Sequence, residues 1–417
     1  MNRCRSHNVV LHFHGGLVPE TDAIKEHEQL GQLYREAGCL PVFCVWRTGA
    51  LEIIRDNYLK IASSVLFQTI FDWSMRCLVG FNQAGKGIGN VAPKTVLDSG
   101  FKDACSEFDS ITKVTQPFSS QSIQSHSERE LRYERPIVEL INDDKSWLTR
   151  DYQDCLNPNP NQGKAISLAL WMKLAKSVAK ICMAVWTRKN SNRDHGLHAT
   201  LIEEIIREFS NEAFRNAIWL GIKDKAKNMV SPDGTCGRVV QMLSNEAINF
   251  SLVGHSAGSI PICYLAKEKE LNIDNIVLFA PACRSDLFLD ALQLNQRSLE
   301  RLRIFTMSDE LEKADPMLKN LVLGARYIYP RSLLYFVSGV LEKEADDRIL
   351  GMHRFMQDPF NTTDDLRLRE SLAGKMVLSK SLADARPGFR CHAESHTDFF
   401  DDSLTCESFL HILRGNK

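Results

Sequence analysis

The chain has 417 residues, 44% hydrophobic and 25% charged, which is typical of a globular protein and excludes a largely disordered chain. Its 51 basic and 52 acidic residues are intermixed, so no basic stripe marks a nucleic-acid surface, and we expect no nucleic-acid partner. No uncharged apolar run approaches the roughly 18 residues that a membrane span needs.

The N-terminus and the cysteines both predict a cytoplasmic protein. Polar residues 1–7 lead directly into an apolar run that starts at Asn8, which leaves no room for the apolar region of a signal peptide. The 12 cysteines are scattered without a CxxC pair, and Cys182 and Cys263 lie in apolar helical patterns. We therefore expect reduced core thiols rather than a disulfide framework or a metal site.

The first elements have the pattern of a β-α-β unit. Asn8–His14 is a short apolar run that stops at Gly15-Gly16, as a buried strand does at a turn. A helix is predicted over Asp22–Ala37 and a second strand over Pro41–Trp46. Strands that alternate with helices in this way predict a parallel sheet.

Residues 51–243 show helical periodicity and almost no strand pattern. The longest predicted helices cover Tyr58–Val79, Ala165–Trp186 and His198–Met229. We expect this block to be a mostly helical insertion, a cap or lid. It separates residues 1–50 from residues 244–417, which together form an α/β core.

Strand patterns resume after the insertion. They cover Asn249–Val253, Asn275–Phe279, Arg301–Thr306 and, more weakly, Lys375–Ser379, and a final helix is predicted over Leu404–Leu413. The predicted fold class is α/β, with one mostly parallel sheet that is assembled from both ends of the chain and flanked by helices.

The strongest motif is the turn Gly254-His255-Ser256-Ala257-Gly258. It follows a predicted strand and precedes an apolar helical pattern that begins near Ser259. A nucleophilic serine needs such a tight turn to lift its hydroxyl above the sheet, and glycines two residues to either side avoid clashes. The alternative is a plain βα turn that binds an anion on its free N–H groups.

The remaining parts of a hydrolytic site can be assigned from position along the chain. Gly16 or Leu17, after the first strand, and Ala257, after the serine, are the predicted N–H donors to an oxyanion. His14 is predicted to be structural. His396, just before the final helix, is the predicted general base, with His392 as its main competitor and His353 and His411 assigned no role.

The imidazolium that forms during acyl transfer needs a carboxylate partner. Asp309 follows the strand Arg301–Thr306 and is the predicted acid. Glu310 and Asp315 lie on the same connection, and Asp286, after the preceding strand, is a further alternative. For Glu310 we favour a solvated loop carboxylate.

The order Ser256, Asp309, His396 resembles the α/β-hydrolase superfamily, and within it the lipase-like serine hydrolases, over roughly residues 8–50 and 245–417. Two departures from the family are the absence of its first edge strands and the long insertion. The resemblance implies hydrolysis of a carboxylic ester, of a small molecule or a lipid, through an acyl-enzyme and without a cofactor or metal. The alternatives are amide or thioester hydrolysis by the same triad, and a non-catalytic interaction protein with this fold.

The insertion is expected to decide the substrate. Its helix Ala165–Trp186 carries Leu170, Leu174, Val178, Ile181 and Val185 on one face and Lys173, Lys176 and Lys180 on another. A basic amphipathic helix of this kind predicts peripheral contact with a membrane surface. The alternative, which we favour, is that the apolar face packs on the protein while the lysines face water. The sequence does not predict an oligomeric state.

Overall fold

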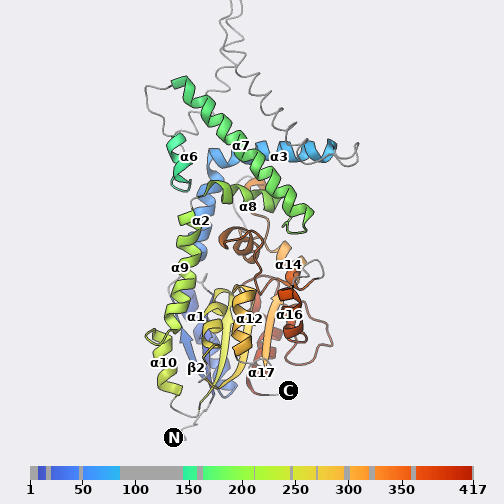
Figure 1. Ribbon diagram of the computed structural model, residues 1–417. Helices are drawn as coiled ribbons and strands as arrows, with labels where there is room; N and C mark the ends of the chain where they lie inside the picture. Colours follow the sequence, from blue (N-terminus) through green and yellow to red (C-terminus); the bar gives the residue numbers. More distant parts are fainter. Residues whose placement is uncertain are drawn as a thin grey trace, which may run out of the picture. The chain divides into compact units, whose positions relative to one another are not determined.

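The computed structural model describes residues 8–15, 20–46, 50–84, 144–156, 163–210, 212–244, 248–268, 271–294, 301–318, 325–357 and 363–415 (Figure 1). The chain divides into two compact units. The sheet unit comprises Met1–Arg55, Arg215–Lys319 and Pro330–Lys417, and the helical unit comprises Asp56–Phe214 and Asn320–Tyr329. The predicted insertion, residues 51–243, thus extends further along the chain than the helical unit does.

The sheet unit is built on six parallel strands in the order β2-β1-β3-β4-β5-β6. The strands are β1 Asn8–Phe13, β2 Leu40–Cys44, β3 Asn249–His255, β4 Ile273–Phe279, β5 Leu302–Met307 and β6 Met376–Ser379. All six predicted strands are confirmed within a few residues. Their apolar runs are nearly continuous because helices cover both faces of a parallel sheet.

The strand order reverses between β1 and β3. From β1 the chain passes to β2 on one side, whereas β3 to β6 follow one another on the other side. Phe13 and Gly254 are in register at the carboxyl ends of β1 and β3. Ligands of open α/β sheets bind in the crevice at such a reversal, outside the carboxyl ends of the strands. Gly15, which follows β1, and the turn at Ser256 both lie here.

Helices cover both faces of this sheet. Tyr34 of α1 and Phe409 of α17 lie 5.9 Å apart between ring centroids, so these two helices share a face. Helices α11 and α12 contact each other, and right-handed crossovers place them on the opposite face. The helical elements of the sheet unit are α1 Glu20–Glu36, α9 Glu212–Val230, α10 Thr235–Ser244, η2 Ser256–Gly258, α11 Ser259–Leu265, α12 Ser285–Leu294, α14 Asp309–Ala314, α15 Leu333–Phe336, η4 Val337–Leu341, η5 His353–Met356, α16 Thr363–Leu372, η6 Asp398–Phe400 and α17 Ser403–Leu413.

The helical unit contains α3 Val65–Ala84, α6 Arg150–Cys155, α7 Gly163–Asn190, α8 Leu197–Phe209, η3 Ala325–Tyr327 and most of α2 Ala50–Ser63. Two predicted helices are each divided in the structure. The helix predicted over Tyr58–Val79 is interrupted at Ser64, whose hydroxyl accepts the Phe67 N–H at 3.2 Å and caps α3. The helix predicted over His198–Met229 ends at Phe209 and restarts at Glu212.

Helix α7 packs its apolar face inside the helical unit, in contact with α3 and α8. The buried side chains are Leu170, Leu174, Val178, Ile181 and Val185. Lys180 forms a surface ion pair with Glu208 at 2.7 Å. This is the packing alternative that the sequence favoured. No helix in the described part of the chain combines the length and apolarity that crossing a membrane requires.

A buried charge network lies in the helical unit. The Glu203 carboxylate, from α8, accepts hydrogen bonds from the His195 ring at 2.7 Å and the Tyr329 hydroxyl at 2.5 Å, and it pairs with Arg188 at 2.7 Å. Burial opposes its ionisation, but His195 and Arg188 outweigh that and lower the pKa of Glu203 to about 2. The network ties the segment that ends at Tyr329 to α7 and α8.

Candidate active site

Ser256 lies at the junction of β3, η2 and α11, as the motif predicts. Its φ is +50°, in the left-handed region that a residue with a Cβ rarely adopts. The side chain is 1% exposed, and the hydroxyl has no hydrogen-bond partner among the described residues. This conformation strains the main chain locally. Two hydrogen bonds to the Ser256 carbonyl oxygen offset the strain, one from the Ala282 N–H at 3.0 Å and one from the Ser259 hydroxyl at 2.6 Å.

Both glycines of the turn are required by packing. A Cβ on Gly254 would lie 2.6 Å from Cδ1 of Ile262 and 2.8 Å from the carbonyl oxygen of Gly258. A Cβ on Gly258 would lie 2.2 Å from the carbonyl oxygen of Phe13. The second contact is with backbone that cannot rotate away, so the turn sits directly on the end of β1.

Gly15, two residues after the end of β1, lies beside the serine. A Cβ on Gly15 would lie 3.5 Å from Cβ of Ser256. The two ring nitrogens of His14 bind main chain, since Nδ1 lies 2.7 Å from the Gly15 carbonyl oxygen and Nε2 accepts the Trp46 N–H at 3.1 Å. His14 therefore has a structural role. Of the predicted oxyanion donors, Ala257 lies in η2, whereas Gly16 and Leu17 are outside the described residues.

His396 lies on the irregular connection between β6 and η6 and is 6% exposed. Neither ring nitrogen has a hydrogen-bond partner among the described residues. Its ring centroid is 5.2 Å from that of His255, the residue before Ser256. Burial, and secondarily His255, hold the pKa of His396 well below its usual range, so the imidazole is neutral at neutral pH. No hydrogen bond joins His396 to Ser256.

The other histidines that the sequence offered lie elsewhere. His392 is exposed, and its backbone N–H donates to Asp402 at 2.6 Å. His353 is part of η5 and His411 part of α17. Of the four histidines that the sequence offers near the C-terminus, only His396 contacts His255, the residue that precedes the serine.

Asp309 does not bind His396 in the structure. Its carboxylate accepts the Tyr335 hydroxyl at 2.5 Å and pairs with Lys313 of the same helix at 2.5 Å. Burial opposes ionisation, but the hydrogen bonds from Lys313 and Tyr335 outweigh it and lower the pKa of Asp309. The structure thus brings Ser256 and His396 to the same region, while the predicted acid binds other partners.

Asp309, Glu312 and Asp315 form one buried face at α14. Burial raises the pKa of Glu312 to about 8, so this carboxyl is largely protonated at neutral pH. Asp315 contacts the predicted base, since its Oδ2 accepts the backbone N–H of His396 at 2.9 Å. Glu310, on the other side of the helix, is exposed as expected.

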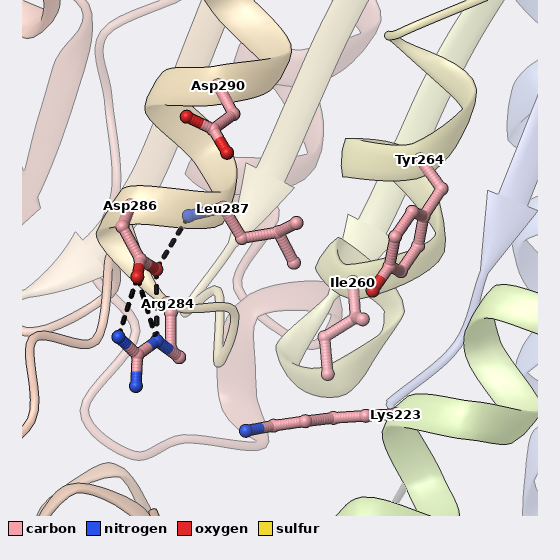
Figure 2. Close-up of a pocket in the computed structure, with 7 residues that line it drawn as sticks. All are labelled: Lys223, Ile260, Tyr264, Arg284, Asp286, Leu287 and Asp290. Atoms are coloured by element: carbon pink, nitrogen blue, oxygen red, sulfur yellow. Dashed lines mark hydrogen bonds and ion pairs between the residues drawn. The ribbon is translucent and has the colours of Figure 1, made fainter. Parts of the chain in front are cut away.

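The last alternative acid, Asp286, belongs to a separate pocket between α11 and α12. Figure 2 shows its carboxylate turned toward the guanidinium of Arg284, and the closest contact is 2.6 Å. The pocket is an open hollow of about 250 Å³ lined by Lys223, Ile260, Tyr264, Arg284, Asp286, Leu287 and Asp290. It contains neither Ser256 nor His396.

Five buried histidines gather around the carboxyl ends of β1 and β3: His12, His14, His27, His255 and His396. Burial is the largest cause of the lowered pKa of each, and it brings the pKa of His27 and of His255 to about 4. Among the described residues, no group of three or more His, Cys, Asp or Glu side chains is arranged to hold a metal ion. The described cysteines are all free thiols, most of them buried.

Sequence reasoning missed one residue of this site and undervalued another. His255 was considered only as a spacer within the motif, and its ring is the one that contacts His396. Asp315 was considered only as an alternative acid, and it binds the main chain instead. For His255, the signal in the sequence is a polar side chain directly beside the predicted nucleophile. No sequence signal distinguishes Asp315 from its neighbours.

Comparison of the chain with family models, with curated proteins and with solved structures gives no match.

Proposed function

We propose that the protein is a serine hydrolase that cleaves carboxylic esters through an acyl-enzyme, on a core of α/β-hydrolase type. The observation that carries the proposal is the conformation of Ser256: a non-glycine residue with φ of +50° at the strand-order reversal, whose buried hydroxyl has no partner among the described residues. Backbone strain of this kind persists where function requires it. A plain βα turn would need neither the strain nor the unsatisfied hydroxyl.

The proposed reaction uses His396 as base. Its neutral imidazole takes the proton of Ser256 as the hydroxyl oxygen attacks the ester carbonyl carbon. The N–H of Ala257 stabilises the oxyanion, together with a donor from Gly16 or Leu17. The intermediate collapses, the C–O bond to the alcohol breaks, and His396 protonates the leaving oxygen. Water, deprotonated by His396, then attacks the acyl carbon, the bond from that carbon to the serine oxygen breaks, and His396 returns the proton to Ser256 as the acid leaves.

The proposal rests on Ser256 and His396. Both are buried, the polar side-chain atoms of both have no partner within the described part of the chain, and the carbonyl of His396 binds the residue next to Ser256. Hydrogen bonds between catalytic groups are often long or poorly aligned without substrate and tighten in the reacting complex. Asp309 as the acid remains a prediction from chain order. A small-molecule or lipid ester, without cofactor or metal, is the proposed substrate class.

The test is covalent labelling of the full-length protein by a fluorophosphonate probe, read by mass spectrometry at Ser256. We expect the wild type to be labelled, Ser256→Ala to be unlabelled, and His396→Ala to lose at least 100-fold in labelling rate. Ser403→Ala, at an exposed serine on α17, is the matched control and should label normally. Hydrolysis of p-nitrophenyl esters, acyl thioesters and peptides then separates ester from thioester and amide chemistry.

The burial of Ser256 and His396 favours one other candidate, a non-catalytic interaction protein that keeps this core. Such a protein would remain unlabelled by the probe and inactive on all three substrate classes while folded. That result would overturn the hydrolase proposal in favour of the binding role.

A further inference from the structure

The main chain of His396 is held at both of its polar groups by side chains from other parts of the sheet unit. Its N–H donates to Oδ2 of Asp315 at 2.9 Å. Its carbonyl oxygen accepts from Nε2 of His255 at 2.8 Å. Asp315 directly follows α14 and His255 ends β3, so the two contacts come from the end of a helix and the end of a strand that lie far apart in the chain.

This arrangement leaves the imidazole of His396 unbound. The His255 ring lies beside it at 5.2 Å between centroids and 36° between planes, and neither His396 nitrogen bonds to a described residue. The two hydrogen bonds therefore fix where the ring is placed without occupying the atoms that would accept a proton. A purely structural histidine would be expected to use at least one ring nitrogen when buried, as His14 does.

The connection that carries His396 needs such anchors. Between the end of β6 at Ser379 and the start of η6 at Asp398 the chain forms no helix or strand. A catalytic base must be held within about 0.5 Å of its working position, and a loop achieves this only through specific hydrogen bonds. The bond from His255 couples the base directly to the residue that precedes the nucleophile.

We propose that Asp315 and His255 are positioning residues for His396, acting on its main chain rather than on its ring. This inference rests on the proposed hydrolase function, in which His396 is the base. In this arrangement Asp315 acts as a hydrogen-bond acceptor, and its charge is secondary. His255 acts as a donor and must carry its proton on Nε2, which a neutral imidazole can do.

The distinction between hydrogen bond and charge can be tested by conservative variants of the full-length protein. Asp315→Asn keeps an acceptor oxygen and loses the charge, and Asp315→Ala loses both. His255→Gln keeps an N–H donor at similar reach, and His255→Leu removes it. Glu310→Gln is the matched control, because Glu310 is an exposed carboxylate on α14, the helix that Asp315 follows.

The readout is the second-order rate of Ser256 labelling by the fluorophosphonate probe, with thermal unfolding to confirm that each variant is folded. We expect Asp315→Ala and His255→Leu to label at least 30-fold more slowly than wild type. Asp315→Asn and His255→Gln should recover most of that loss, to within about fivefold of wild type, and Glu310→Gln should label normally. Wild-type labelling of Asp315→Ala, or failure of Asn to recover what Ala loses, would overturn the inference.

We call the two hydrogen bonds that Asp315 and His255 make to the main chain of His396 the clamp. A second readout separates failure of the clamp from failure of the hydrolase proposal. In ¹⁵N-histidine-labelled protein, the ring signals of His396, assigned with His396→Gln, should shift in Asp315→Ala and stay near their wild-type positions in Asp315→Asn. If the wild type is never labelled by the probe but the signals behave in this way, the clamp stands and the hydrolase proposal fails. If the His396 signals do not respond to any of these variants, the clamp is wrong.

Discussion

Gly258 and Phe13 touch through their backbones: a methyl group added to Gly258 would lie 2.2 Å from the carbonyl oxygen of Phe13. The end of β1 and the turn that carries Ser256 are therefore packed without room for a side chain. Because Phe13, the last residue of β1, is paired with Cys44 of β2 on one side and with Gly254 of β3 on the other, its carbonyl cannot move aside.

Gly258→Ala should consequently unfold more easily than the wild type, by roughly 3 kcal/mol in urea denaturation, and should lose labelling at Ser256. Gly221→Ala is the matched control. Gly221 lies in α9 with nothing within 4 Å of an added Cβ, so alanine there should stabilise by about 0.5–1 kcal/mol. Equal unfolding of the two variants would contradict the close packing at Gly258.

The strain at Ser256 makes a prediction of its own. Glycine adopts a φ of +50° without a steric penalty because it has no Cβ, whereas alanine, like serine, has a Cβ and retains the penalty. Ser256→Gly should therefore be more stable than Ser256→Ala by about 1 kcal/mol, although both lose the proposed nucleophile. The measurement is the free energy of unfolding of the two variants. If alanine were as stable as glycine, the left-handed conformation assigned to residue 256 would be wrong.

The sheet was predictable because buried parallel strands appear in sequence as short, continuous apolar runs, and all six were found. Helix ends were less predictable. The periodicity of Tyr58–Val79 continues through Ser64, and only the capping bond from its hydroxyl to Phe67 marks the break. Apolar spacing carries no information about such a local bond, so one long helix was predicted where two exist.

The strand-to-helix turn at Ser256 was predictable for a different reason, since a five-residue motif and its flanking elements are all local. The partners of His396 were not. Asp315 is 81 residues away along the chain and binds a backbone group, which is the same in every residue type. The hydroxyl that binds Asp309 comes from Tyr335, 26 residues further along the chain. Long-range hydrogen bonds of this kind depend on tertiary placement rather than on spacing.

The buried histidines predict that the protein loses stability in mild acid. The pKa of His255 is about 4 in the folded protein and 6.5 when exposed, so the unfolded chain binds more protons between these values. Stability should fall as the pH drops from 6.5 toward 4, by on the order of 3 kcal/mol for His255 alone at the lower end. Urea midpoints at pH 7.5, 6.0 and 5.0 measure this decline.

His27 contributes to the same decline, since burial also brings its pKa to about 4. His27→Gln, which removes the titrating group, should therefore flatten the loss of stability between pH 6.5 and 5. A stability that stays constant over this range in the wild type, or a slope that His27→Gln leaves unchanged, would contradict the neutral, buried state of the cluster.

The Glu203 network makes a prediction for the helical unit. Glu203→Gln leaves Arg188 buried without its full counter-charge, and breaking a buried ion pair in this way costs roughly 3–5 kcal/mol. Lys180→Gln, which removes the surface pair with Glu208, is the control and should cost less than about 1 kcal/mol. Hydrogen exchange of α8 amides should rise in the first variant and not in the second. Equal effects would show that Glu203 is not the anchor of this unit.

Asp309 is the residue on which chain order and observed contacts differ. Chain order predicts it as the acid that holds His396, whereas its carboxylate binds Tyr335 and Lys313. Because these contacts do not involve His396, we expect Asp309→Asn to slow fluorophosphonate labelling of Ser256 by less than tenfold. The loss of a triad acid would instead cost about 10⁴-fold. Tyr335→Phe, which removes one partner of the same carboxylate, should lower stability by about 1 kcal/mol and leave labelling near wild type. A folded Asp309→Asn protein that labels more than 1,000-fold slower would instead establish Asp309 as the acid, reaching the imidazole once the substrate is bound.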